Sequence, residues 1–450
     1  KDGSLAEIKP CHDELLLKQK KQCDRFETLA LREANKNDNY FPSEARDLCF
    51  HQQFENIARM HGDKVIASFH GLTVTYSYLN DLSNRMARYL LSKGLSYKQV
   101  VALCVDQPLD LMLCMLAVSK AGGAFIIVPK STNLTYYSRA FDGMSIDYAI
   151  GSEQVEEDIT WIDFENSIHN HVIDGFDSED LHLEISHHSP LYIYYRDLNS
   201  SLINVQEVSH FTLMSSLEFA QNDMTLTIND RWLTEFTHDV DSVFMTLWLP
   251  ILAAGSVEIV SDKMINPSLA SALSSTNGII ARQDFWDSNR EKIILESKVA
   301  KGIVFGEKVA IKTIKDIVSA DINIISIYQP PSSPLFQAHS AISSMILDQS
   351  EHLPVGRVSI NNDICIVGYN GKRLPIGFVG DMYIGSIGRL IYPFQDEYVR
   401  FDKTKPNIYD LEFYYNTGIK GRINKSGCIE YLYKTQEPVN TVLEKHTFTP

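Results

Sequence analysis

Residues Val100–Val128, VVALCVDQPLDLMLCMLAVSKAGGAFIIV, hold two apolar runs on either side of a helical segment. Val100–Val105 has the length and composition of a buried strand, and Leu109–Lys120 has the length of a helix. Gly122-Gly123 ends that helix, because glycine readily adopts the conformation that closes a helix C-terminus. Ala124–Val128 then forms a second apolar strand. Strand, helix and strand in this order predict parallel strands in a sheet covered on both faces.

The same alternation resumes downstream and sets the expected fold class. Strand-like and helical segments alternate from Asp230 to Ile327. After Pro354 the pattern changes to short alternating strands with tight turns, for example Asp363–Val367 and Asp381–Ile384, which indicates a smaller β-rich unit. We therefore expect an α/β protein with two parallel-type sheets, covering helices and a β-rich subdomain.

We expect four parts along the chain. Residues 1–39 carry apolar positions at helical intervals and are interpreted as a helical linker between domains. Residues 40–350 are expected to form the α/β core, and residues 351–440 the β-rich subdomain. Residues 441–450 are interpreted as a tail.

Composition restricts the class of partner. The formal net charge is -16, so we expect neither a general nucleic-acid surface nor an anionic-membrane surface. The seven cysteines are an odd number, which favours a reduced, cytoplasmic chain. The longest apolar runs are far shorter than the roughly 20 residues that span a bilayer. No Cys-x-x-Cys or His-x-x-x-His pair occurs, so no metal site is expected.

Five short blocks carry a resemblance to a known family. In chain order they are Leu72-Thr73-Val74-Thr75-Tyr76-Ser77-Tyr78-Leu79, Lys120-Ala121-Gly122-Gly123-Ala124-Phe125, Leu353-Pro354-Val355-Gly356-Arg357, Pro375-Ile376-Gly377-Phe378-Val379-Gly380-Asp381-Met382-Tyr383-Ile384-Gly385 and Tyr415-Asn416-Thr417-Gly418. Their order and spacing resemble those of adenylation domains of nonribosomal peptide synthetases, within the adenylate-forming superfamily. The resemblance runs from about Tyr40 to about Asn440 and implies the large N-terminal core of such a domain.

The segment that aligns with the family's phosphate loop departs from the family pattern. That pattern, Tyr-Thr-Ser-Gly-Ser-Thr-Gly-x-Pro-Lys-Gly, falls without gaps on Tyr195–Val205. Asn204 replaces the lysine, and Ser200 keeps a hydroxyl where the family has threonine. The three glycines are replaced by Leu198, Ser201 and Val205. Glycine lets backbone N–H groups approach phosphate oxygens, so the resemblance implies a loop that has lost phosphate binding.

Other nucleotide-binding positions of the family are also altered. Tyr328 remains and could still stack on an adenine. The glutamate that holds magnesium in the family is Ser332 here, and a hydroxyl is a poorer ligand than a carboxylate for a hard cation. The aspartate that binds the ribose hydroxyls is Ile419, which has no acceptor. The hinge block falls on Tyr433–Asn440, and residues 441–450 lead toward a C-terminal lid that this sequence does not contain.

The amino-acid pocket and the histidines leave alternatives open. Asp239 and Asp241 both lie near the family's ammonium-binding aspartate, and an insertion makes that alignment ambiguous. The simpler interpretation is two solvated loop acids. His210 follows the phosphate-loop segment where a helix should begin, and we expect it to be a packing or capping residue.

These features predict a catalytically inactive adenylation domain without catalytic residues, kept as a scaffold between condensation-type and carrier domains. Its vestigial nucleotide positions are Ser200, Asn204, Tyr328, Ser332 and Ile419. One alternative is active ATP-dependent adenylation with an atypical loop, in which Arg196 or Lys130 supplies the missing cation and ATP and magnesium are needed. Another is an amino-acid-binding regulatory module that uses Asp239 or Asp241. Under the first prediction no cofactor is expected, and an MbtH-like protein is a possible partner.

Overall fold

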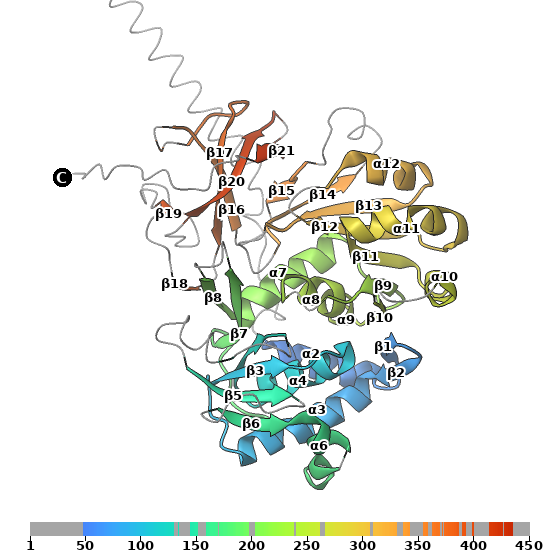
Figure 1. Cartoon of the computed structure of the whole chain (residues 1–450), viewed down its shortest axis with the longest axis vertical. Coiled ribbons are helices and arrows are strands. Elements are labelled where there is room, and N and C mark those ends of the chain that lie inside the picture. Colours follow the sequence, from blue (N-terminus) through green and yellow to red (C-terminus); the bar gives the residue numbers. More distant parts are fainter. Residues whose placement is uncertain are drawn as a thin grey trace, which may run out of the picture.

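The chain is shown in Figure 1 as a computed structural model. The structure describes residues 48–129, 134, 145–151, 159–169, 171–197, 203–237, 240–261, 266–306, 309–330, 336–342, 354–358, 362–369, 371, 373–386, 389–392, 398–399, 414–425 and 427–434. Two large sheets with helices against them and a smaller antiparallel sheet make up this part of the chain. The predicted α/β fold with a β-rich subdomain is therefore confirmed.

The seven-stranded sheet has the strand order β18-β8-β7-β4-β3-β5-β6, and in Figure 1 it runs from β18 at the left to β6 near the bottom. Its strands in chain order are β3 (Val100–Cys104), β4 (Ala124–Ile127), β5 (Ile146–Gly151), β6 (Thr160–Asp163), β7 (Pro190–Asp197), β8 (Ile203–Ser209) and β18 (Arg389–Tyr392). The strands from β7 to β6 run parallel, whereas β8 pairs antiparallel with both β7 and β18. The strand–helix–strand prediction for Val100–Val128 is thereby confirmed.

The nine-stranded sheet has the order β15-β14-β13-β12-β11-β9-β10-β1-β2. Its strands are β1 (Val65–Phe69), β2 (Leu72–Thr75), β9 (Arg231–Glu235), β10 (Ser256–Val260), β11 (Gly278–Arg282), β12 (Lys301–Gly306), β13 (Asn323–Tyr328), β14 (Ala338–Ile342) and β15 (Arg357–Val358). Its centre, from β1 to β13, is parallel, and both edges are antiparallel. The carboxyl ends of parallel strands form the usual ligand crevice of such sheets, and Tyr328 ends one of them.

The smaller sheet is antiparallel and corresponds to the predicted β-rich subdomain. Its strands are β16 (Asn362–Val367), β17 (Gly380–Ser386), β19 (Tyr398–Val399), β20 (Tyr414–Ile423) and β21 (Ile429–Lys434). Strands β15 and β18 also come from this part of the sequence, but they pair with the two α/β sheets. The subdomain is therefore joined to each large sheet by a strand of its own.

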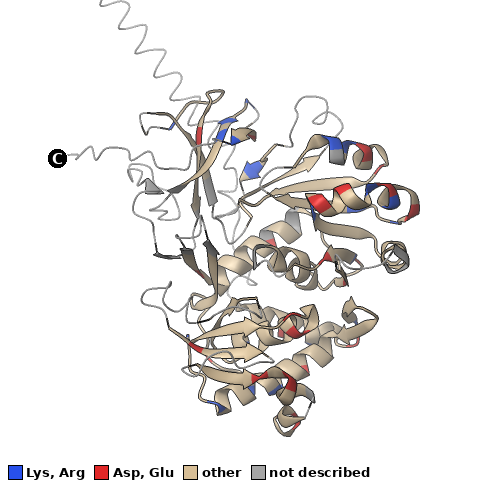
Figure 2. Cartoon of the chain, in the orientation of Figure 1, with Lys and Arg blue, Asp and Glu red and all other residues tan. Residues whose placement is uncertain are grey.

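Helices lie against the large sheets (Figure 1). They are α2 (Phe50–His61), α3 (Tyr76–Ser92), α4 (Pro108–Lys120), α6 (Phe164–His169), α7 (His210–Asp223), α8 (Val240–Val243), α9 (Leu249–Ile251), α10 (Asn266–Ser275), α11 (Gln283–Glu296) and α12 (Ile311–Ser319), with a 3₁₀ turn at Val172–Gly175 and a π-helical turn at Phe244–Trp248. Charges of both signs mix on the outer helices α11 and α12 (Figure 2). Among the described helices, none is long and apolar enough to cross a bilayer.

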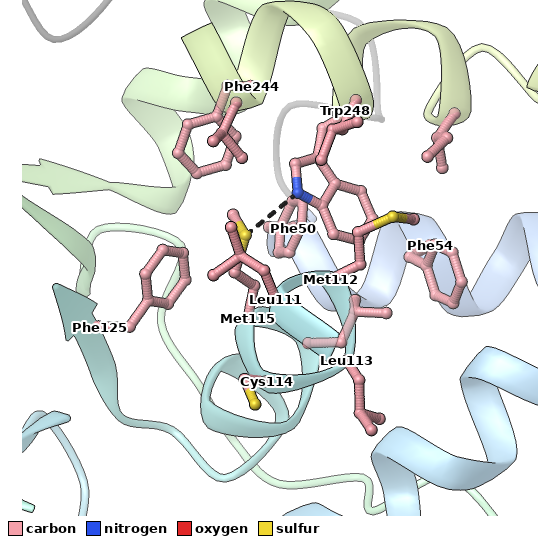
Figure 3. Close-up of a cluster of buried hydrophobic side chains, with 14 of the residues drawn as sticks. Phe50, Phe54, Leu111, Met112, Leu113, Cys114, Met115, Phe125, Phe244 and Trp248 are labelled. Carbon is pink, nitrogen blue, oxygen red and sulfur yellow. Dashed lines mark hydrogen bonds between the residues drawn. The ribbon is translucent and has the colours of Figure 1, made fainter. Parts of the chain in front are cut away.

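The largest core surrounds α4. Almost all side chains of this helix are buried, as expected of a helix whose apolar residues are not confined to one face. Phe50 and Phe54 of α2 pack edge-on against Trp248, with ring centroids 4.7 and 6.0 Å apart. The indole Nε1 of Trp248 donates to Sδ of Met115, 3.4 Å away (Figure 3). Helix α2 is thereby fixed between α4 and the segment around Trp248, and this packing places His51 and the start of α7 side by side.

Candidate functional site

The aligned phosphate-loop segment is built into a β-hairpin. The antiparallel register pairs Tyr195 with Val205, Arg196 with Asn204, and Asp197 with Ile203. The ladder therefore extends over both the lysine position and the last glycine position of the family loop. Only residues 198–202 lie between the two strands, and Ser200 is among these five, outside the described residues. The backbone of Asn204 belongs to β8.

Val205 replaces a family glycine and contributes to a core. It is fully buried in a cluster with strand residues of the same sheet, among them Ala102, Ile126 and Ile193. On the opposite strand, the hydroxyl of Tyr195 donates to the backbone oxygen of Ile127, 3.3 Å away. Val205 thus stabilises an extended β8, whereas a glycine there would leave the backbone free to adopt other conformations.

Tyr328 closes β13 and is almost completely buried. Its exposed fraction is 3%, and its backbone pairs with Gly306 of β12 and Ala338 of β14. Gln329, which stands at a family glycine, is also buried, and its backbone N–H donates to the Gly306 oxygen at 3.1 Å. Ser332, at the family's magnesium-binding position, lies outside the described residues.

Ile419 lies on β20 and has no exposed surface. It belongs to the same apolar cluster as Tyr328, although the two come from different sheets. The cluster also contains Val355, Ile364, Ile366, Met382, Ile384, Ile423 and Ile429. The structure therefore brings two of the five vestigial positions together, and it does so through hydrophobic packing.

Hydrogen bonds hold the segment formed by Asn416, Thr417 and Gly418 just before Ile419. The amide of Ile419 donates to the hydroxyl of Thr417 at 3.2 Å, and that hydroxyl donates to the Met382 oxygen at 2.9 Å. The amide of Gly418 donates to Oδ1 of Asn416 at 2.9 Å. Gly418 has a φ of 70°, which a residue with a side chain rarely adopts. The Asn416-Thr417-Gly418 block therefore has a structural reason of its own.

Of the two candidate substrate-pocket acids, only Asp241 lies in the part of the chain that the structure describes. Asp239 lies outside the described residues, and the backbone of Asp241 lies in the short helix α8. The hydroxyls of Thr237 and Ser242, which flank this stretch, are 2.7 Å apart. Asp239 and Asp241 thus stay predictions as pocket residues.

A buried polar seam lies where α2, α4 and α7 meet. His210 begins α7, is 1% exposed, and accepts the Phe50 amide on Nδ1 at 3.2 Å. Nδ1 of His51 is 2.9 Å from the Ser119 hydroxyl. Burial lowers the pKa of His210 to about 3 and the pKa of His51 well below its usual value. Both rings are therefore neutral at physiological pH, and His210 is a packing residue that accepts a backbone N–H, in line with the expected packing or capping role.

Lys120, the last residue of α4, carries a charge into the interior. Its Nζ donates to Oδ1 of Asn80 at 2.7 Å and to Oδ1 of Asn84 at 2.6 Å, and lies 3.4 Å from Oε1 of Glu55. Burial lowers the pKa of Lys120 to about 8 and raises that of Glu55. A cavity of about 210 Å³ lies beside the pair. Because the ammonium already has its acceptors, this arrangement joins α2, α3 and α4.

Cys49 lies beside His51 and His210 in the same polar seam. The possible metal-ligand atoms of these three residues all lie within 4.8 Å of one another. The thiol of Cys49 donates to the Ile185 oxygen at 3.4 Å, and burial raises its pKa to about 12. Sequence spacing did not predict this group, because His210 is far from the other two along the chain. Only the packing of α2 against α7 brings them together.

Comparison with known proteins supports the fold and its class. A family described as "AMP-binding enzyme" matches residues 54–145. The chain is 20% identical over 401 residues to a dimodular nonribosomal peptide synthase of Bacillus subtilis, covering 86% of this chain and 17% of that protein. The chain also matches PksN, a polyketide synthase of the same organism, with 23% identity over 422 residues, and it covers 8% of that protein. The chain thus spans less than a fifth of the length of these curated relatives.

Two solved structures have the same architecture. The N-terminal subdomain of Klebsiella oxytoca NpsA, in complex with 3-hydroxybenzoyl-AMSN, superposes with a TM-score of 0.73 at 15% identity, over 86% of this chain and 100% of that one. An artificially fused NpsA–ThdA adenylation–PCP di-domain gives 0.74 at 14% identity, over 86% and 79%. The chain therefore has the fold of AMP-binding enzymes. More particularly, it has the fold of the adenylation-domain core of a nonribosomal peptide synthetase.

Proposed function

We propose that this chain is a catalytically silent adenylation domain that serves as a structural platform in a nonribosomal peptide synthetase. The observation that carries the proposal is the β7–β8 hairpin. Its paired strands extend over the places where the family has a lysine and a glycine, and Asn204 and Val205 stand there instead. A triphosphate would meet neither the lysine charge nor the glycine backbone at these positions.

The loss is large enough to matter for function. Each hydrogen bond to a charged group contributes about 1.5–3 kcal/mol. Two such contacts amount to about 3–6 kcal/mol, and every 1.4 kcal/mol changes affinity tenfold, so binding weakens at least about a hundredfold. Adenylation also needs positive charge on the phosphates as a carboxylate attacks, since electrostatic stabilisation is usually the largest catalytic contribution. Without that charge, the transition state loses this electrostatic stabilisation.

Packing at the ribose position supports the same function. An aspartate there would accept hydrogen bonds from ribose hydroxyls, whereas Ile419 is fully buried and packs in the cluster that contains Tyr328. Hydrophobic contact between the β-rich subdomain and β13 thus stands where nucleotide contacts would be needed. Such packing favours a rigid scaffold over a ligand-binding crevice.

The proposed setting follows from the relatives. A dimodular synthase and a fused adenylation–PCP protein carry domains of this fold within longer polypeptides. We place the present domain between a condensation-type domain and a carrier domain, with residues 1–39 as the linker and an MbtH-like protein as a further partner. This role needs neither ATP nor magnesium. We propose the cytoplasm as the location of the protein.

ATP–pyrophosphate exchange tests the proposal. The polypeptide, extended through any lid that follows residue 450, is assayed with each proteinogenic amino acid and with aryl acids. NpsA, whose N-terminal subdomain was solved in complex with 3-hydroxybenzoyl-AMSN, is the positive control. We expect no exchange above background. Exchange with any acid contradicts the silent assignment.

Active adenylation with an atypical loop is the second candidate, and one observation favours it. Arg196 is the register partner of Asn204, so a cationic residue stands across the ladder from the lost lysine. Lys130 is the other cation considered, and it lies outside the described residues. If the chain were active, Arg196→Ala would abolish exchange and Arg231→Ala, at the start of β9, would not. An amino-acid-binding regulatory module using Asp239 or Asp241 would instead show a rise in melting temperature with one amino acid.

A further inference from the structure

We draw no further inference here: the strongest candidate, the buried side-chain cluster of Cys49, His51 and His210 where α2 and α7 begin, carries no metal site, because the Phe50 amide already occupies the lone pair of neutral His210 and the cluster belongs to the polar seam already described.

Discussion

Ile419 of β20 and Tyr328 of β13 are buried in one hydrophobic cluster, although they belong to different sheets. In the family that the sequence resembles, the two positions contact the ribose and the adenine. Here both side chains belong to an apolar cluster that also contains residues of β16 and β17. The β-rich subdomain and β13 of the nine-stranded sheet therefore share one hydrophobic cluster.

Restoring the family aspartate by Ile419→Asp is expected to destabilise the fold without restoring nucleotide binding. A carboxylate at this fully buried site would stand among the apolar side chains of the cluster, and an uncompensated buried charge costs about 3–5 kcal/mol. Urea unfolding measures the loss. Ile419→Val is the matched control, expected to cost about 0.5–1.5 kcal/mol. An aspartate variant of wild-type stability that binds ATP would refute the packing argument.

Returning glycine to the loop by Val205→Gly should weaken the hairpin. The change removes a fully buried side chain, worth about 1.5–3 kcal/mol, and adds backbone entropy of about 0.5–1 kcal/mol. We expect a loss of about 2–4 kcal/mol in the free energy of unfolding. Leu72→Gly, on the edge strand β2 where the side chain is 67% exposed, should cost less. Equal effects at the two sites would contradict the role assigned to Val205.

The buried histidines make the domain sensitive to acid. The pKa of His210 is about 3 in the folded chain, below the 6.5 of a free imidazole, so the unfolded chain binds the proton more readily. This contribution to stability is complete above pH 6.5 and falls as the pH drops toward 3. Between pH 6.5 and pH 4 the loss is about 3 kcal/mol, at about 1.36 kcal/mol per pH unit.

The acid effect is measured by urea unfolding at pH 7 and pH 4.5 for wild type and His210→Asn, whose side-chain oxygen can still accept from Phe50. We expect the variant to lose less stability on acidification than wild type does. His182→Gln, at an exposed position, is the control and should follow wild type. Identical pH profiles for all three proteins would show that His210 is not responsible.

The Lys120–Glu55 pair should show strong coupling. Lys120→Met leaves the carboxylate of Glu55 buried without its cation, and breaking a buried pair costs about 3–5 kcal/mol. The double variant Lys120→Met, Glu55→Gln removes both charges and should recover part of that loss. Chemical unfolding of the two single variants and the double variant gives the coupling. Simple additivity of the single effects would mean that the two groups do not interact.

The lowered pKa of Lys120 predicts how the stability of the fold changes at alkaline pH. The pKa of this lysine is about 8 when folded and near 10.4 when free, so between these values the unfolded chain binds more protons. Stability of wild type relative to Lys120→Met should therefore rise as the pH increases from 8 to about 10. Unfolding experiments at pH 7.5 and pH 9.5 check this. A relative decrease would show that the charged form is favoured by folding.

Much of the fold was predictable because local pattern and tertiary position agree. The predicted helix Leu109–Lys120 is α4 with one residue more at its start. The sequence pattern also predicts a hairpin with strands Val65–Phe69 and Leu72–Tyr76, and β1 and β2 form it, with β2 ending at Thr75. His70 and Gly71 both have positive φ, as a two-residue hairpin turn requires. Helical spacing predicts a helix over Tyr78–Lys93, and α3 begins two residues earlier at Tyr76, because Thr75 caps it by accepting a hydrogen bond from the Tyr78 amide.

The site was less predictable, since its contacts join distant segments. Substitution at family positions pointed to Ile419 and Val205, but not to the cores in which they are buried. The meeting of His51 with His210 depends on how α2 packs against Trp248, which no local pattern contains. The π-helical turn at Phe244–Trp248 likewise has no sequence signal, because its residues read as an ordinary apolar helix.

Isothermal titration of the chain with ATP and magnesium tests the central claim most directly, with the NpsA N-terminal subdomain titrated in parallel. The account predicts no saturable heat up to about 1 mM ATP. A dissociation constant of about 1 mM corresponds to a binding free energy of only about 4 kcal/mol. A saturable isotherm with a micromolar constant would contradict it, because a hairpin with Asn204 and Val205 at these positions could then hold a triphosphate after all.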